Sequence, residues 1–200
     1  MNTPSLAATL FQQLQQSQGL EQVSRQLGVE PAQASSAVQS ALPLLLGALG
    51  QNASSPQGAQ SLLNALQRDH APTAAGSGGF DLGGILGAVL GGTGGPASNG
   101  SGILGHVFGG QSPKAAELLG QKTGLDSSRS SQLLALLAPI VMSFLAQRFA
   151  LQGNAGELGQ ALGQERGGSG LGGWLDQDGD GKFGLGDVVK LGTGLLGKRP

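Results

Sequence analysis

An all-α fold is the class that this sequence predicts, on three observations. The stretch from Asp126 to Phe149 is apolar on nearly every side of a helix and contains a proline, Pro139. A related stretch around Pro43 lies 96 residues earlier. Almost no part of the chain alternates apolar and polar residues as a strand does. We therefore expect two related helical units, each built on an apolar helix kinked by its proline, together with Gly-rich linkers and a short acidic C-terminal loop.

The repeat needs no gap in its alignment. It pairs Gly28-Val29-Glu30 with Gly124-Leu125-Asp126, Pro43 with Pro139, Leu49 with Leu145, Gln51 with Gln147, and Leu62, Ala65 and Leu66 with Leu158, Ala161 and Leu162. A proline inside a helix removes a backbone hydrogen bond and costs about 3 kcal/mol. A proline at the same phase of two apolar helices therefore argues for a shared architecture.

The two helical units are expected at residues 1–70 and 102–163. In the first, helices are predicted over Pro4–Gln18, Leu20–Leu27, Pro31–Leu49 and Ser61–Arg68, with Glu30 near the cap of the third. In the second, a helix begins at Ser112-Pro113, Gly124 turns the chain, Asp126 caps the apolar helix, and Leu158–Gly163 adds a final turn. Linkers rich in Gly and Ser are expected at 71–101 and 164–173, and the acidic tail at 174–200.

Two short segments share one pattern. GILGAVLGG occupies residues 84–92 within the first linker, and GILGHVFGG occupies residues 102–110. The later copy is expected to open the second helical unit, and the earlier copy could compete for the same docking surface. Both are short and nearly uncharged, so any peripheral membrane association through them would be marginal.

Composition excludes several classes of function. The 11 basic and 12 acidic side chains nearly balance, so bulk charge recruits neither nucleic acid nor an anionic membrane. The chain has no cysteine, which removes disulfides, thiol catalysis and thiolate metal sites. The N-terminus lacks the features of a signal peptide, which predicts a cytoplasmic protein. The longest apolar run, Leu133–Ala146, is shorter than the roughly 20 residues of a spanning helix, so we expect a buried core helix.

The acidic tail contains the sharpest motif. Asp176, Asp178, Asp180, Gly181, Phe183 and Asp187 match positions 1, 3, 5, 6, 8 and 12 of an EF-hand-type calcium loop. Three carboxylates would converge on the ion, and the carbonyl of Lys182 would supply a further ligand. Asp187 is one methylene shorter than the usual glutamate, and no second loop is present to pair with this one. The candidate metal ligands are therefore Asp176, Asp178, Asp180, Lys182 and Asp187, and the alternative is an Asp-Gly turn that caps a helix over Val188–Leu196.

Signals for DNA binding and catalysis are weak. Residues 20–38 resemble a helix-turn-helix with Gly28 at the turn, but the second helix offers Gln33, Ser35, Ser36 and Gln39 to DNA and no basic residue. His70 and His106 are attached to no nucleophile or carboxylate motif. The Gly-rich strings follow no predicted strand, so they predict no phosphate-binding loop. We expect neither an enzyme nor a nucleic-acid-binding protein.

The second helical unit resembles a known family. ILGHVFGG followed by AAELLGQKTGLDSSRSSQLLALLAPIVMSFL is similar to the central motif of the YidB-like bacterial proteins, a widespread family of unknown function. The first unit, with ALPLLLGALGQNASSPQGAQSLLNALQRDH, is similar to longer members, many of which carry a terminal Leu-Asp-x-Asp-Gly-Asp-Gly segment. The resemblance implies an all-helical fold and no known catalytic residue. Gly184 and Gly186 make this tail less rich in carboxylates than is usual for the family.

These observations favour a non-enzymatic helical scaffold or interaction protein that self-associates or binds another protein. The expectation rests on the apolar helices, which must be enclosed on all sides, and on the two docking-like segments. A calcium-binding docking module that acts through the tail is the alternative, with calcium as the only cofactor expected.

Overall fold

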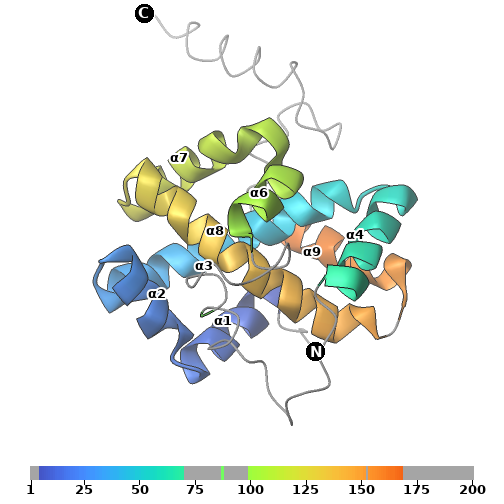
Figure 1. The fold of residues 1–200 in the computed structure, drawn as a ribbon, viewed down its shortest axis with the longest axis horizontal. Helices are drawn as coiled ribbons and strands as arrows, with labels where there is room; N and C mark the ends of the chain where they lie inside the picture. Colours follow the sequence, from blue (N-terminus) through green and yellow to red (C-terminus); the bar gives the residue numbers. More distant parts are fainter. Residues whose placement is uncertain (1–4, 70–86, 88–98, 152, 169–200) are drawn as a thin grey trace, which may run out of the picture.

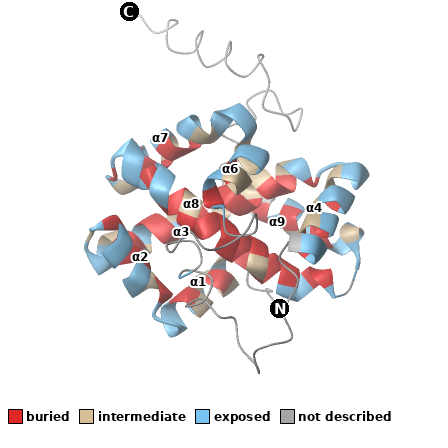
Figure 2. Ribbon diagram, in the orientation of Figure 1, coloured by how far each residue is buried: buried red, intermediate tan, exposed pale blue. Residues whose placement is uncertain are grey.

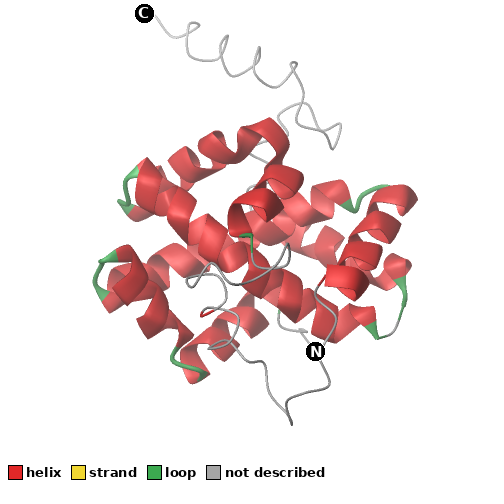
Figure 3. Cartoon of the chain, in the orientation of Figure 1, coloured by secondary structure: helices red, strands yellow, loops and turns green. Residues whose placement is uncertain are grey.

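The computed structural model describes residues 5–69, 87, 99–151 and 153–168. Within these ranges the chain forms helices joined by short turns and contains no strand, which confirms the all-α prediction (Figure 3). The helices are α1 (Leu6–Gln16), α2 (Gly19–Leu27), α3 (Pro31–Asn52), α4 (Pro56–Asp69), α6 (Gly100–Phe108), α7 (Ser112–Thr123), α8 (Ser127–Leu145) and α9 (Ala155–Gly168). A 3₁₀ turn, η2 (Gly109–Gln111), follows α6, and a π-helical turn, η3 (Ala146–Ala150), follows α8.

Helices α3 and α8 form the centre of the molecule, and the other helices surround them (Figure 1). Both are buried along most of their length (Figure 2). Their leucines, together with Ile140, Val141 and Phe144 of α8, belong to one hydrophobic core that also includes residues of α1, α2, α4, α6, α7 and α9. The stretches 1–70 and 102–163 therefore contribute to a single core.

The last helix of each stretch packs on the other stretch. Helix α9 packs chiefly against α3, and α4 packs against α9 and η3. Hydrogen bonds from side chains of the first stretch also join the two: Asn52 Nδ2 donates to the carbonyl of Val107 over 2.8 Å, and Gln67 Nε2 donates to the carbonyl of Ala150 over 3.0 Å. The second bond satisfies a carbonyl of the π-helical turn, where the regular hydrogen-bond ladder is interrupted.

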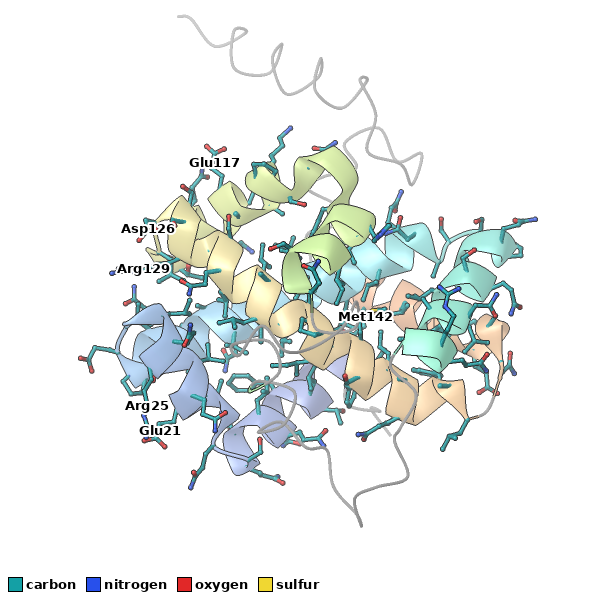
Figure 4. The ribbon with its side chains drawn as sticks, viewed as in Figure 1. Glu21, Arg25, Glu117, Asp126, Arg129 and Met142 are labelled. Atoms are coloured by element: carbon teal, nitrogen blue, oxygen red, sulfur yellow. The ribbon has the colours of Figure 1, made fainter. Side chains whose placement is uncertain are left out.

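The predicted starts of α3 and α8 and the predicted ends of α2 and α7 are confirmed. The Asp126 side chain accepts a hydrogen bond from the N–H of Arg129 over 2.8 Å, and Pro31 occupies the first turn of α3 after Glu30. Gly28 and Gly124 end α2 and α7 with φ of 62° and 72°, a conformation that disfavours side chains. Charged side chains such as Glu21, Arg25 and Glu117 point away from the centre (Figure 4).

Three other predicted boundaries are wrong. Helix α4 begins at Pro56 and not at Ser61, because Ser55 Oγ accepts from the N–H of Gly58 and caps it, and α6 begins at Gly100, inside the linker predicted at 71–101. Helix α9 runs to Gly168, so the start of the stretch 164–173 is helical and not part of a linker. The physical reason is burial, because Leu158, Leu162 and Glu165 lie on one face of α9 and are enclosed by the rest of the protein.

The most apolar helical stretch also meets the criterion for a membrane span. Ser127–Ala150 is long and apolar enough by composition to cross a bilayer, but 78% of its most apolar window is buried inside the protein. This burial agrees with the prediction of a buried core helix. Because the rest of the protein encloses the apolar side chains, the helix needs no membrane to cover them.

A glycine allows α3 and α9 to approach closely. A Cβ added to Gly50 would lie 2.7 Å from the carbonyl oxygen of Leu162, which is less than any normal contact. The two backbones therefore meet at this point without an intervening side chain. In contrast, a Cβ added to Gly47 on the same helix would meet nothing within 4 Å.

The proline of α8 is covered in a similar way. Pro139 is buried and has no N–H to donate to the carbonyl of Ala135, four residues earlier. A Cβ added to Gly100 would lie 1.8 Å from that carbonyl oxygen, so a hydrogen on the Gly100 Cα must point at it. This Cα–H···O contact at the first turn of α6 covers the carbonyl that the proline leaves without its helical partner.

Replacement of Gly50 by alanine tests the contact between α3 and α9. We expect G50A to lower the free energy of unfolding by about 1–3 kcal/mol, because two backbones must separate. G47A is the matched control and should raise it by about 0.5–1 kcal/mol, since alanine favours the helix. Urea unfolding followed by circular dichroism measures both changes, and equal effects of the two substitutions would contradict the packing.

Replacement of Gly100 by alanine tests the cover over Pro139. We expect G100A to destabilise the protein by about 3 kcal/mol, because the new methyl group would displace α6 from α8. The control is G105A, also on α6, where a Cβ meets nothing within 4 Å and a gain of about 0.5–1 kcal/mol is expected. Thermal unfolding distinguishes them, and a G100A protein as stable as the wild type would rule out the contact.

Candidate functional site

The residues predicted to hold calcium lie outside the described part of the chain. Asp176, Asp178, Asp180, Lys182 and Asp187 all belong to residues 169–200, and the contact expected between the tail and an ion stays a prediction. Within the described ranges, no three His, Cys, Asp or Glu side chains come close enough to hold a metal ion. His70 also lies outside these ranges, and His106 is exposed on α6.

The segment GILGHVFGG forms α6 and the turn after it. Leu104 is buried, and Ile103, Val107 and Phe108 are half-buried against the core. The same register would place Leu82 of the earlier copy where Gly100 lies, and the Ala135 carbonyl leaves no space there for any Cβ. The earlier copy, of which only Gly87 is described, therefore cannot replace α6 in this register.

The helix-turn-helix-like segment forms α2, the turn at Gly28 and the start of α3. Arg25 is a basic side chain of this segment, and its Nη2 lies 2.7 Å from Oε1 of Glu21 one turn earlier. Both side chains are exposed, so the pair contributes little to stability, and the acidic partner offsets the positive charge that a phosphate would meet.

A cavity of about 420 Å³ lies between α1, α3 and α9. Its apolar walls are Ala7, Ala8 and Phe11 of α1 with Leu42 and Pro43 of α3. Its polar lining consists of Ser5, Gln39, Gln164 and Glu165. Apolar walls with a few converging polar groups are typical of binding sites for small molecules and side chains.

Glu165 is the acidic group of this lining, and its side chain is 6% exposed. Its Oε1 accepts a hydrogen bond from the backbone N–H of Leu6, at the first turn of α1. Ser5 caps the same helix end, with its Oγ accepting from the N–H of Ala8 over 3.1 Å. The carboxyl group thus satisfies an N–H that has no partner within its own helix and places a negative charge at the positive end of α1.

Sequence reasoning missed Glu165 because it assigned residues 164–173 to a linker. A signal was present: Leu158, Leu162 and Glu165 follow the spacing of one helix face. If the helix is extended beyond Gly163, Glu165 lies on the same face as the two leucines. Only then does the pattern predict a buried or capping carboxyl group. The cap of α1 by a residue so distant in sequence could not be predicted from local pattern.

The two helix prolines differ in their surroundings. Pro139 is buried, and the Ala135 carbonyl that it leaves without a helical partner lies against Gly100, whereas Pro43 is half-buried and lines the cavity together with Gln39. Pro43 has no N–H to donate to the carbonyl of Gln39, four residues earlier in α3. The turn of α3 from Gln39 to Pro43, which lacks this backbone hydrogen bond, therefore forms part of the cavity wall.

Among the described residues of the lining, Glu165 is the acidic side chain and none is basic. Phe11 is half-buried, so one part of its ring is available to a molecule in the cavity. Chemically, the site combines an aromatic and aliphatic wall with acceptor oxygens, an arrangement suited to a ligand that has an apolar stem and a hydrogen-bond donor.

Comparison with known proteins places the chain in a family. The model of a family described as bacterial protein of unknown function (DUF937) matches residues 8–148, which include most of α1 and all of α8 but not α9. No curated protein and no solved structure matches the chain. The match agrees with the resemblance seen in the helix that contains Pro139, and the chain belongs to this bacterial DUF937 family.

Proposed function

We propose that this protein is a non-enzymatic helical scaffold that binds protein partners, including further copies of itself, and that the cavity between α1, α3 and α9 is a docking site. The cavity is the observation that carries the proposal. The cavity is open to solvent, because four residues of its lining, Ser5, Ala8, Gln39 and Gln164, are exposed. Two further lining residues, Leu42 and Glu165, are buried.

Other apolar surface supports an interaction role. Leu151, which follows η3, is 80% exposed, and α6 leaves Ile103, Val107 and Phe108 only half-buried. Contact with a partner would remove this area from water, with a gain of about 25 cal/mol for each Å² of apolar surface.

The use of Glu165 also supports a role without catalysis. It is the buried acidic side chain of the described ranges, and one of its oxygens is already engaged by the N–H of Leu6. A carboxyl group held in this way positions a helix and one wall of a cavity, which is what a docking site requires.

The docking role is tested by blocking the cavity. Ala8 is an exposed part of the lining, so A8W should fill the site without disturbing the core. Gln12, also exposed on α1, is not part of the lining, and Q12W is the matched control. Size-exclusion chromatography with light scattering and pull-downs from bacterial lysate measure self-association and partner binding.

We expect the wild type and Q12W to self-associate at micromolar concentration and to retain the same partner, and A8W to lose at least one of these interactions. A strictly monomeric wild type that retains no partner would overturn the proposal. Equal behaviour of A8W and Q12W would overturn the role of the cavity.

A second candidate is calcium-dependent docking through the acidic tail, favoured by the match of Asp176, Asp178, Asp180 and Asp187 to a calcium loop. The short Asp187 predicts weak binding, with Kd of roughly 10⁻⁵–10⁻³ M. The bound ion would then present the tail to a partner.

Calorimetric titration of the full chain tests this candidate. Replacement of Asp176, Asp178 and Asp180 by asparagine should abolish the heat of calcium binding, and D187E should tighten binding because glutamate reaches the ion with both oxygens. The control carries E30Q, E117Q and E157Q, which remove the same number of charges from exposed positions. No heat from the wild type at millimolar calcium would rule the candidate out.

A further inference from the structure

We infer that the cavity between α1, α3 and α9 binds the side-chain ammonium group of a lysine presented by a partner protein. The inference rests on the proposed docking role of this cavity and adds the chemistry of what enters it. It is drawn from the charge of the lining, the shape of the walls and the single free oxygen of Glu165.

The charge of the lining favours a cation. Glu165 is 6% exposed, and its Oε1 accepts from the N–H of Leu6, whereas its Oε2 has no hydrogen bond to any residue of the described ranges. Glu165 lines the cavity, so this second oxygen is the acceptor that its carboxyl group can offer to a bound molecule. A carboxylate oxygen in so buried a position gains a strong, charge-assisted bond from an ammonium group.

The walls suit an unbranched aliphatic stem. Ala8 and Phe11 lie on one side of the cavity and Leu42 and Pro43 on the other, so four methylene groups can lie between apolar surfaces while the ammonium group reaches Glu165. The Phe11 ring adds a face that attracts cations. At the mouth, the amides of Gln39 and Gln164 can pair with the backbone of the segment that carries the lysine.

The single free oxygen favours lysine over arginine. A guanidinium group binds a carboxylate best through two parallel hydrogen bonds, one to each oxygen. Oε1 of Glu165 already accepts from Leu6, so a second guanidinium bond to it must share that oxygen with the backbone N–H. An ammonium group is a compact point charge that loses nothing by this restriction.

The test is an NMR titration of the full-length protein with four probes. Three are acetylated and amidated pentapeptides, Ala-Ala-X-Ala-Ala, in which X is lysine, arginine or norleucine, and the fourth is free n-hexylammonium. We expect the lysine peptide to shift the backbone amide signals of Leu6, Ala8, Phe11 and Gln164 in a saturable way, because these residues line or adjoin the cavity. The norleucine peptide, which keeps the stem and lacks the charge, should bind at least about tenfold more weakly, and the arginine peptide several times more weakly.

Two variants on α9 identify the charge responsible. E165Q keeps a carbonyl oxygen for the Leu6 N–H and removes the charge, so lysine-peptide binding should fall at least about tenfold while the amide spectrum stays that of the folded protein. E157Q, an exposed position on the same helix, should bind like the wild type.

The outcomes separate this inference from the docking proposal. Equal binding of the lysine and norleucine peptides, or unchanged binding by E165Q, would overturn the lysine assignment. The docking role is tested independently, by the comparison of A8W with Q12W. Tighter binding of n-hexylammonium than of the lysine peptide would replace a protein partner with a free alkylamine. An absence of any shift at millimolar lysine peptide would overturn the inference.

Discussion

Enclosure of two helices that are apolar on nearly every side is the constraint on which the rest of this structure depends. Helices α3 and α8 pack together, but each can cover only one face of the other. The remaining faces are covered by α1, α2 and α9 around α3, and by α6 and α7 around α8. Because covering helices are drawn from both halves of the chain, neither half contains a complete core of its own.

Close backbone contacts make this enclosure tight. Gly50 lets α3 meet the Leu162 carbonyl of α9, and Gly100 lets α6 meet the Ala135 carbonyl that Pro139 leaves without a helical partner. At the other proline, Pro43, the neighbours are Phe11 and the last turns of α9, and they leave a cavity of about 420 Å³. The site thus arises where one of two similar helices is less completely covered than the other.

The same cavity links the first and the last of the described helices. Glu165, near the end of α9, accepts from Leu6 at the start of α1, so one carboxyl group both completes the cap of α1 and supplies the charge of the site. A molecule bound there would contact the first and last described helices together with α3. Its binding would therefore favour the arrangement in which these three helices are assembled.

The sequence by itself determined the structural features that depend on residues three or four positions apart in the chain. Those features are the all-α class, the caps at Asp126 and Pro31, the turns at Gly28 and Gly124, the helical prolines and the family resemblance. The acidic tail was read from its sequence pattern, and it stays a prediction. Only the tertiary structure decided that α9 covers α3, that Gly100 covers the carbonyl before Pro139, and that Glu165 lies against Leu6 in a cavity. The reason is physical: local pattern shows which face of a helix must be buried, whereas the packing of all helices decides which distant residues bury it.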